Sequence, residues 1–193
     1  MKNNDILNEN QIKSKLIFST IFITSFELLS NLIITNLKGH ICYDCIILKS
    51  DNSFDFKDCE IYLNTIKNIK HKELKNSKNE FYSCCKWYLK EEIIDLNEFN
   101  KIQEIRKYRN KLSHDFTNIL LNNEIEINEE LIIELKIILQ KIGEFWFKIE
   151  LDITNIDSIN SKIEPNIISV KLVEYLEGIL QSEKTSTRDS LKQ

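Results

Sequence analysis

The chain has very few residues that break regular secondary structure. Only three glycines and one proline occur among its 193 residues. A sheet protein needs glycine and proline at many of its turns, so this scarcity argues against a β fold. Leucine, isoleucine, lysine, glutamate and asparagine are abundant instead. We therefore expect an all-α fold, namely a single-domain helical bundle of about five to six helices.

The chain also lacks a net positive charge and the cysteine spacing of a disulfide framework. The formal net charge is −4, so the chain does not have the positive excess of proteins that coat nucleic acids non-specifically. Any contact with a nucleic acid must then come from a local basic patch. The five cysteines are odd in number, and their spacing is not that of a secreted disulfide framework. We expect a reduced, cytoplasmic protein.

The most hydrophobic stretch, residues 16–37, has to be tested as a membrane span, which takes about 20 mostly apolar residues. On a helical wheel its polar residues share one arc and its apolar residues gather opposite. The arc contains Thr20, Thr24, Glu27, Ser30, Asn31 and Thr35, and the apolar face contains Phe18, Ile21, Phe22, Phe26, Leu28, Leu29, Leu32 and Ile33. No small-residue cleavage site follows. We expect an amphipathic core helix, with no membrane contact.

Periodicity and capping residues predict the order of the helices. The first runs from about residue 10 to residue 37 and ends near Gly39, and residues 39–58 form a mixed connection. Further helices are expected over residues 58–71, 81–94 and 98–121, then from Asn128 onward and from Pro165 onward. In the helix over residues 58–71 the inward positions are Ile61, Ile66 and Ile69. The domain spans residues 1–181, and residues 182–193 are expected to be a disordered tail.

The helix predicted over residues 98–121 carries an arginine at an apolar position. Its apolar stripe consists of Ile102, Ile105, Leu112, Phe116 and Ile119, and Arg109 occupies the slot in the middle. A guanidinium cannot lose its charge, so a semi-buried arginine needs a carboxylate or a phosphate as its partner. A phosphate is one answer, since the planar fork of donors holds two oxygens at once.

His114 follows Arg109 by five residues, about 140° around an ideal helix, so the two side chains do not share one face. Asn110 and His114, in contrast, are an i,i+4 pair. Asn110 can therefore hydrogen-bond the imidazole and fix its tautomer, which a catalytic histidine requires. An imidazole titrates near neutral pH and is suited to general acid–base chemistry.

The segment Arg109-Asn110-Lys111-Leu112-Ser113-His114 resembles the R-x4-H motif of the HEPN superfamily (higher eukaryotes and prokaryotes nucleotide-binding domains). Many members are metal-independent endoribonucleases, and a polar residue directly after the arginine is usual in active ones. The resemblance implies a HEPN-like homodimer with a composite active site, in which two motif helices bring two arginines and two histidines around one cleft. No cofactor or metal is implied.

The resemblance implies cleavage of tRNA or mRNA by attack of a 2′-hydroxyl on the adjacent phosphodiester. His114 would act as general base or acid, Arg109 would stabilise the phosphorane charge, and Asn110 would orient His114. Residues 101–111 contain five basic residues and one acidic residue, a local basic surface. We expect RNA contacts from Arg106, Lys107 and Lys111. Tyr108 either stacks on a base or is structural.

A biological role as a toxin or phage-defence (abortive infection) effector follows from the resemblance alone, with an antitoxin or regulatory protein as a further partner. Some members have a tyrosine two residues after the histidine that an antitoxin adenylylates. This chain has Phe116 there, so an antitoxin would have to act by another route, such as occluding the cleft. The alternative is a catalytically inactive HEPN-like helical module that binds RNA or a partner protein. The third interpretation is an unrelated helical bundle that matches the R-x4-H motif by chance.

Three weaker patterns have ordinary explanations. Cys42 and Cys45 form a C-x2-C pair near His40, but Cys84-Cys85 is a poor second half for a zinc site, so we expect buried thiols. A run of lysines over residues 67–78 extends an RNA path or, as we expect, is a solvated surface. Glu27 either pairs with Arg109 or is a plain surface or interface carboxylate, and we expect the latter.

Overall fold

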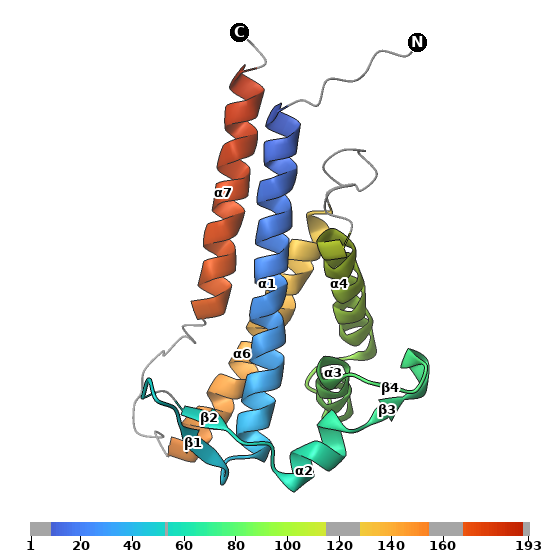
Figure 1. Ribbon diagram of the computed structural model, residues 1–193. Coiled ribbons are helices and arrows are strands. Elements are labelled where there is room, and N and C mark those ends of the chain that lie inside the picture. Colours follow the sequence, from blue (N-terminus) through green and yellow to red (C-terminus); the bar gives the residue numbers. More distant parts are fainter. Residues whose placement is uncertain (1–8, 53, 115–127, 155–167, 191–193) are drawn as a thin grey trace. The chain divides into compact units, whose positions relative to one another are not determined.

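The computed structural model describes residues 9–52, 54–114, 128–154 and 168–190, and it confirms the all-α prediction (Figure 1). Two-stranded hairpins are the only sheets in these ranges. The helices of the described residues are α1 (Glu9–Ile41), α2 (Glu60–Tyr62), α3 (Glu80–Lys90), α4 (Leu96–His114), α6 (Glu130–Thr154) and α7 (Ile168–Ser190). The helix count of about five to six is thus met by the described part of the chain.

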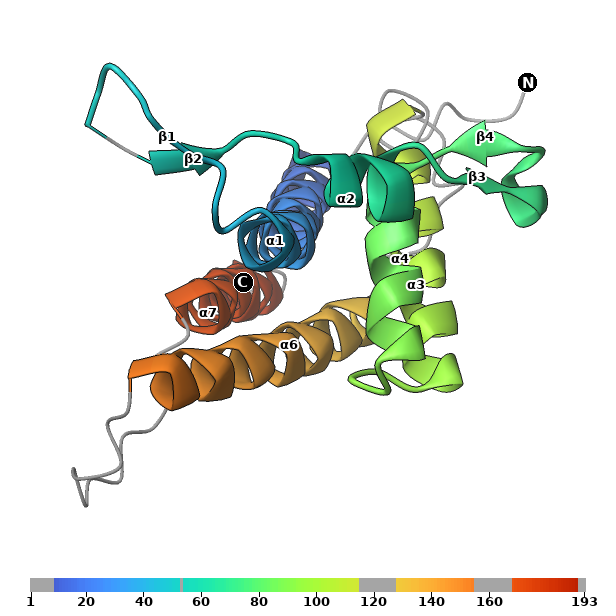
Figure 2. The same ribbon diagram turned by 90° about the horizontal axis from the view of Figure 1, so that it is seen from below.

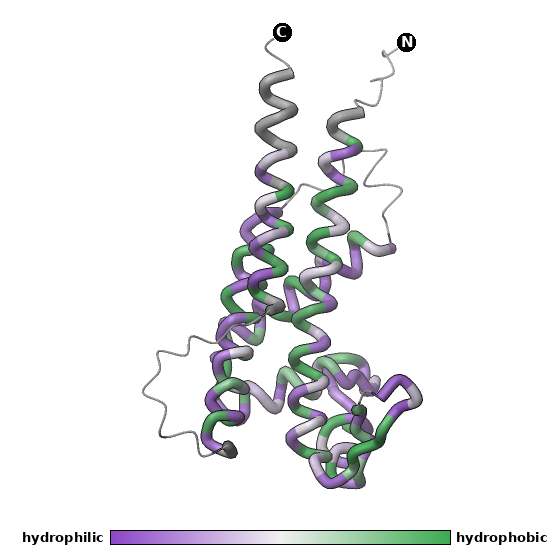
Figure 3. Tube along the Cα trace, turned by 90° about the vertical axis from the view of Figure 1, so that its left-hand side faces the viewer, coloured by the Kyte–Doolittle hydropathy of each residue, from purple (hydrophilic) through white to green (hydrophobic). Residues whose placement is uncertain are grey.

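The first helix has the amphipathic pattern that the sequence predicts. Phe22, Leu29 and Ile33 are fully buried, whereas Thr20, Thr24 and Glu27 are exposed. Apolar residues recur along α1 for most of its length (Figure 3). Residues Ile12–Ile41 are long and apolar enough to cross a membrane by length and composition, a test that the core helix of a soluble protein also passes; 44% of the most apolar window is buried.

Helix α1 ends at Ile41, two residues beyond Gly39, near which its end was predicted. Gly39 has no positive φ angle and is therefore not a left-handed cap. A Cβ atom at this position would lie 3.0 Å from the ring of Phe56. The aromatic ring thus packs directly against the helix backbone, and a side chain at this position would require the ring to shift.

Residues 39–58, expected as a mixed connection, contain a β-hairpin. Strand β1 (Ile46–Leu48) pairs antiparallel with β2 (Phe54–Phe56), with Ile46 opposite Phe56. β-branched and aromatic residues in these segments favour strands, and the backbone N–H of Asn52 donates to the carbonyl of Lys49 at 3.1 Å in the turn. A second hairpin joins β3 (Lys70–His71) to β4 (Ser77–Lys78).

The helix predicted over residues 58–71 is much shorter in the structure. After α2 the chain forms a π-helical turn, Leu63–Lys67. Tyr62 and Ile66 are buried, so Ile66 is inward as predicted, but Ile61 is 65% exposed and Ile69 36% exposed. The buried residues Tyr62 and Ile66 are four positions apart, whereas the predicted inward set needs spacings of five and three, and the helical segment does not continue beyond Lys67.

The chain divides into two compact units that alternate along the sequence. The first comprises residues 1–28, 101–141 and 164–193, and the second comprises residues 29–100 and 142–163. The domain boundary at residue 181 stays a prediction. In the first unit α7 lies beside the N-terminal half of α1 (Figures 1 and 2), and Lys136 of α6 pairs with Glu177 of α7 at 2.7 Å.

Helix α7 continues to Ser190 and so includes residues 182–190, which were expected to be disordered; no glycine or proline interrupts this segment.

The core of the second unit contains a buried hydrogen-bonded chain of three groups. The indole N–H of Trp146 donates to the hydroxyl of Tyr88 at 2.7 Å, and that hydroxyl donates to the carbonyl of Ile33 at 3.2 Å. Tyr88 is fully buried, and burial raises the pKa of its hydroxyl. Each polar group is satisfied, so α1, α3 and α6 are joined here without an unpaired buried donor.

His71 gives the second unit a pH-dependent stability. It is buried, and its Nε2 lies 2.7 Å from the hydroxyl of Ser83. Burial lowers the pKa of His71 below 6.5; Glu73 opposes this effect and Lys86 adds to it. The unfolded chain therefore binds the proton more readily than the folded one, so this contribution is present above about pH 6.5 and is lost as the pH falls through the folded pKa.

We expect His71→Gln to reduce the slope of the free energy of unfolding against pH below about pH 6.5, by at most about 1.4 kcal/mol per pH unit. Glutamine retains a donor but does not titrate in this range. Urea denaturation at several pH values measures the slope. An unchanged slope in the variant would show that His71 does not couple folding to pH.

Candidate nucleic-acid interface

Arg109 lies in the apolar stripe of α4, as the sequence predicts. Ile102, Ile105 and Leu112 are buried, and the side chain of Arg109 between them is 29% exposed. The continuation of the stripe at Phe116 and Ile119 lies outside the described residues. Arg109 is thus a partly exposed charged side chain on an otherwise buried stripe.

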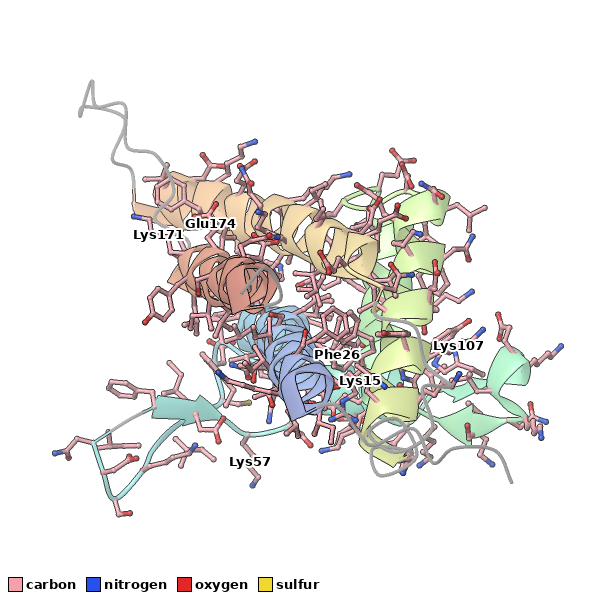
Figure 4. All side chains as sticks on the ribbon, turned by 90° about the horizontal axis from the view of Figure 1, so that it is seen from above. Lys15, Phe26, Lys57, Lys107, Lys171 and Glu174 are labelled. Atoms are coloured by element: carbon pink, nitrogen blue, oxygen red, sulfur yellow. The ribbon has the colours of Figure 1, made fainter. Side chains whose placement is uncertain are left out.

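Three neighbours hold the guanidinium of Arg109. Its Nη2 donates to Oε1 of Glu27 on α1, and its Nη1 donates to Oδ1 of Asn110 at 3.2 Å. The guanidinium carbon lies 5.5 Å from the ring centroid of Phe26, which lies on the side of α1 facing α4 (Figure 4). Its Nε is buried and has no hydrogen-bond partner among the described residues. An ion pair, a hydrogen bond and a cation–π contact therefore fix this arginine from one side.

The contact with Glu27 corrects the expectation of a plain surface carboxylate. Glu27 is 52% exposed yet pairs directly with Arg109. The two residues are 82 positions apart in the sequence, so only the packing of α1 on α4 brings them together. Sequence reasoning identified Glu27 as a candidate because it lies on the polar arc of α1. Nothing in the sequence indicated that Phe26 contacts Arg109, because its position is that of an ordinary core residue.

His114 is the last residue of α4 and is exposed. No hydrogen bond joins it to Asn110 within the described part of the chain, and the amide oxygen of Asn110 accepts from Arg109. Asn110 therefore orients the arginine in this structure, and its predicted action on His114 stays a prediction. A surface imidazole at the end of a helix is free to approach a substrate or a second copy of the chain.

The basic residues of α4 divide into paired and unpaired groups. Lys101 pairs with Glu104 at 2.9 Å, and Arg109 pairs with Glu27. Arg106, Lys107 and Lys111 form no ion pair in the described ranges, and Lys107 projects from α4 away from α1 (Figure 4). These three cations are available to phosphate groups.

Tyr108 is packed inside an aromatic cluster. Its ring lies 4.9 Å from Phe22 and 6.4 Å from Phe18, both edge-to-face, and its hydroxyl accepts from the backbone N–H of Asn128 at 3.3 Å. Burial raises the pKa of this hydroxyl. The packing favours a structural tyrosine, the alternative to base stacking on RNA.

The weaker patterns are separate from this site. No group of three histidine, cysteine, aspartate or glutamate side chains that would hold a metal occurs among the described residues. Cys42 lies against Cys59 rather than forming a knuckle with Cys45. In the lysine run, Lys67 pairs with Asp58, and Lys70, Lys72, Lys75 and Lys78 are exposed. These positions agree with a solvated surface.

Comparison with known proteins finds no matching family model, no matching curated protein and no matching solved structure. Function is therefore inferred from the residues, their geometry and the resemblance of the motif.

Proposed function

We propose that the chain is a metal-independent endoribonuclease of HEPN type that uses Arg109 and His114. The observation that carries this proposal is the setting of Arg109. A permanently charged guanidinium lies in the apolar stripe of α4, three neighbours orient it, and 29% of the side chain is exposed. Holding a cation in place before the substrate arrives is how proteins stabilise charge that develops during a reaction.

The geometry of α4 favours a dimeric site. Arg109 and His114 point about 140° apart on one helix, so one chain does not direct both at a single phosphate. Two copies of α4 in a homodimer would supply both groups from different chains. One His114 would accept the proton of the 2′-hydroxyl, and the other would protonate the leaving 5′-oxygen. The products would be a 2′,3′-cyclic phosphate and a 5′-hydroxyl.

Arg109 would stabilise the dianionic phosphorane in this reaction, with Asn110 as its positioning residue. For that step the phosphate has to compete with Glu27 for the guanidinium fork. Arg106, Lys107 and Lys111 would hold the flanking phosphates of tRNA or mRNA. A toxin or phage-defence effector, acting in the cytoplasm and restrained by an antitoxin, is the biological role that this activity would serve.

The competing function is an inactive helical module that binds RNA or a partner protein. The pair between Arg109 and Glu27 favours it, because a guanidinium already neutralised by a carboxylate has a structural role without any substrate. Asn110 turned toward Arg109, rather than toward His114, favours it as well.

Cleavage of RNA in EDTA separates the two functions. The purified protein is incubated with total tRNA and with mRNA, and RNA retention is measured in parallel by filter binding. Metal-independent fragmentation supports the ribonuclease. Tight binding without fragmentation of either RNA would overturn it and support the module.

A basic surface on α4 predicts a specific salt dependence of RNA binding. We expect Lys107→Ala combined with Lys111→Ala to weaken binding and to reduce the slope of log K against log salt by about 0.7 for each phosphate of single-stranded RNA that the variant no longer neutralises. The matched control is Lys72→Ala combined with Lys75→Ala, two exposed lysines of the second unit. Filter binding at several salt concentrations gives both slopes. Equally weakened binding in the two double variants would place the RNA path elsewhere.

A further inference from the structure

Two cysteines that the motif does not use face each other in the second unit. Cys42 directly follows α1 and is 1% exposed, and Cys59 is the N-cap residue of α2 and is half-buried. Their sulfur atoms lie 3.1 Å apart. A disulfide bond is about 2.05 Å long, so about 1 Å of approach would join them. Sequence spacing gave no sign of this pair, because 16 residues separate the two cysteines.

The backbone holds both thiols in this arrangement. Cys42 Sγ donates to Cys59 Sγ and accepts from the backbone N–H of Cys59 at 3.4 Å. Cys59 Sγ accepts from the backbone N–H of Tyr62 at 3.4 Å and donates to the carbonyl of Ile41 at 3.7 Å. The backbone N–H of Cys42 itself donates to the carbonyl of Lys38 at 2.8 Å. The pair is therefore fixed by the end of α1 and the start of α2 rather than by flexible side chains.

The two sulfurs differ in acidity. The hydrogen bond from Cys42, followed by the one from the backbone N–H of Tyr62, lowers the pKa of Cys59. Burial raises the pKa of Cys42. A cysteine with a lowered pKa and some exposure is the one that forms a reactive thiolate, and the buried neighbour is placed to resolve its oxidised form.

We propose that Cys42 and Cys59 are an oxidation site for hydrogen peroxide, at which a reversible disulfide forms. The Cys59 thiolate attacks one peroxide oxygen; the O–O bond breaks, and after protonation the products are a Cys59 sulfenic acid and water. The Cys42 sulfur then attacks the Cys59 sulfur; the S–O bond breaks, the hydroxide takes the Cys42 proton, and a second water leaves. The two thiols lose two electrons in total, and hydrogen peroxide is reduced to two molecules of water.

The disulfide would close a ring of chain around the first hairpin. Ile46, Leu48 and Phe54 of this hairpin are exposed apolar residues. Tyr43 and Phe56, also inside the ring, line a cavity of about 760 Å³. Oxidation would add a covalent link between the end of α1 and the start of α2. The link would restrain the apolar hairpin and the cavity residues Tyr43 and Phe56. A disulfide of this kind in a reducing compartment is regulatory or redox-sensing rather than structural. The site is independent of Arg109 and His114.

The test uses the full chain, reduced and then treated with hydrogen peroxide. Free thiols are blocked, the protein is digested, and linked peptides are identified by mass spectrometry. We expect a Cys42–Cys59 cross-linked peptide, protection of two of the five thiols, and full reversal by dithiothreitol. A cross-link through Cys45, or five thiols still free under peroxide that oxidises a model dithiol, would overturn the proposal.

Variants separate the roles of the two sulfurs. Cys42→Ser should leave a sulfenic acid on Cys59 that dimedone traps, and Cys59→Ser should abolish the reaction at Cys42. Cys45→Ser is the matched control and should form the same cross-link as the wild type. Circular dichroism confirms that each variant is folded, and the wild-type cross-link is decisive without them. Dimedone on Cys42 rather than Cys59 would contradict the assigned roles.

Discussion

Replacing His114 with alanine is expected to lower the rate of RNA cleavage by about 100-fold to 10,000-fold, the usual contribution of a general acid or base. The side chain is exposed at the end of α4 and forms no hydrogen bond with the described residues. We therefore expect its removal to leave the fold intact. The neighbouring exposed Ser113 offers a matched control, and Ser113→Ala should cleave at nearly the wild-type rate. Single-turnover cleavage of a labelled RNA measures all three proteins.

A loss of activity in the His114→Ala variant supports a catalytic role of His114 only if the variant retains RNA binding and helicity. Equal cleavage by the wild type and the variant would remove His114 from the mechanism. Arg109 is a less direct target, because its removal also leaves Glu27 without its partner. Arg109→Lys keeps the charge but not the planar fork and is the better substitution at that position.

The largest effect on stability is expected from Trp146→Ala, which should lower the free energy of unfolding by about 3–5 kcal/mol. Trp146 is 6% exposed, and its ring centroid lies 5.0 Å from that of Phe145 and 5.5 Å from that of His40. Alanine leaves a cavity and removes the donor to the hydroxyl of Tyr88. Urea denaturation monitored by circular dichroism measures the change.

Two further variants isolate the contributions at Trp146. Trp146→Phe retains most of the packing but loses the indole N–H, so it should be destabilised by only about 1–3 kcal/mol. Tyr175 is an aromatic residue that is 68% exposed, and Tyr175→Ala should stay within about 0.5 kcal/mol of the wild type. A Trp146→Ala protein as stable as Tyr175→Ala would refute the central place of this tryptophan in the core.

Local periodicity was sufficient to predict the parts of the fold that pack as regular helices. The buried face of α1 and the stripe of α4 follow the 3.6-residue repeat, so Phe22, Leu29 and Ile105 were assigned correctly from their spacing. The exposed positions of Ile61 and Ile69 were missed because a continuous helix was expected over residues 58–71, whereas the helical segment ends at Lys67. The close approach of the Phe56 ring to Gly39 depends on the packing of the following hairpin, which the pattern of α1 does not specify.

The candidate site shows a similar division between local and long-range information. The sequence indicated that Arg109 has an anomalous position and needs an anionic partner, because both statements concern one helix. It did not select Glu27 as that partner, and it assigned Asn110 to His114 rather than to Arg109. The contact between Cys42 and Cys59 could likewise not be predicted from the sequence. Such pairs depend on how elements pack, which residue spacing does not specify.

The most direct test of the central claim is to map the ends of RNA fragments produced in EDTA by the wild-type protein and by His114→Ala. A metal-independent ribonuclease that uses His114 predicts fragments with 2′,3′-cyclic phosphate and 5′-hydroxyl ends from the wild type and almost none from the variant. Fragments with 5′-phosphate ends, or the same fragments from both proteins, would contradict the claim that α4 carries the active centre.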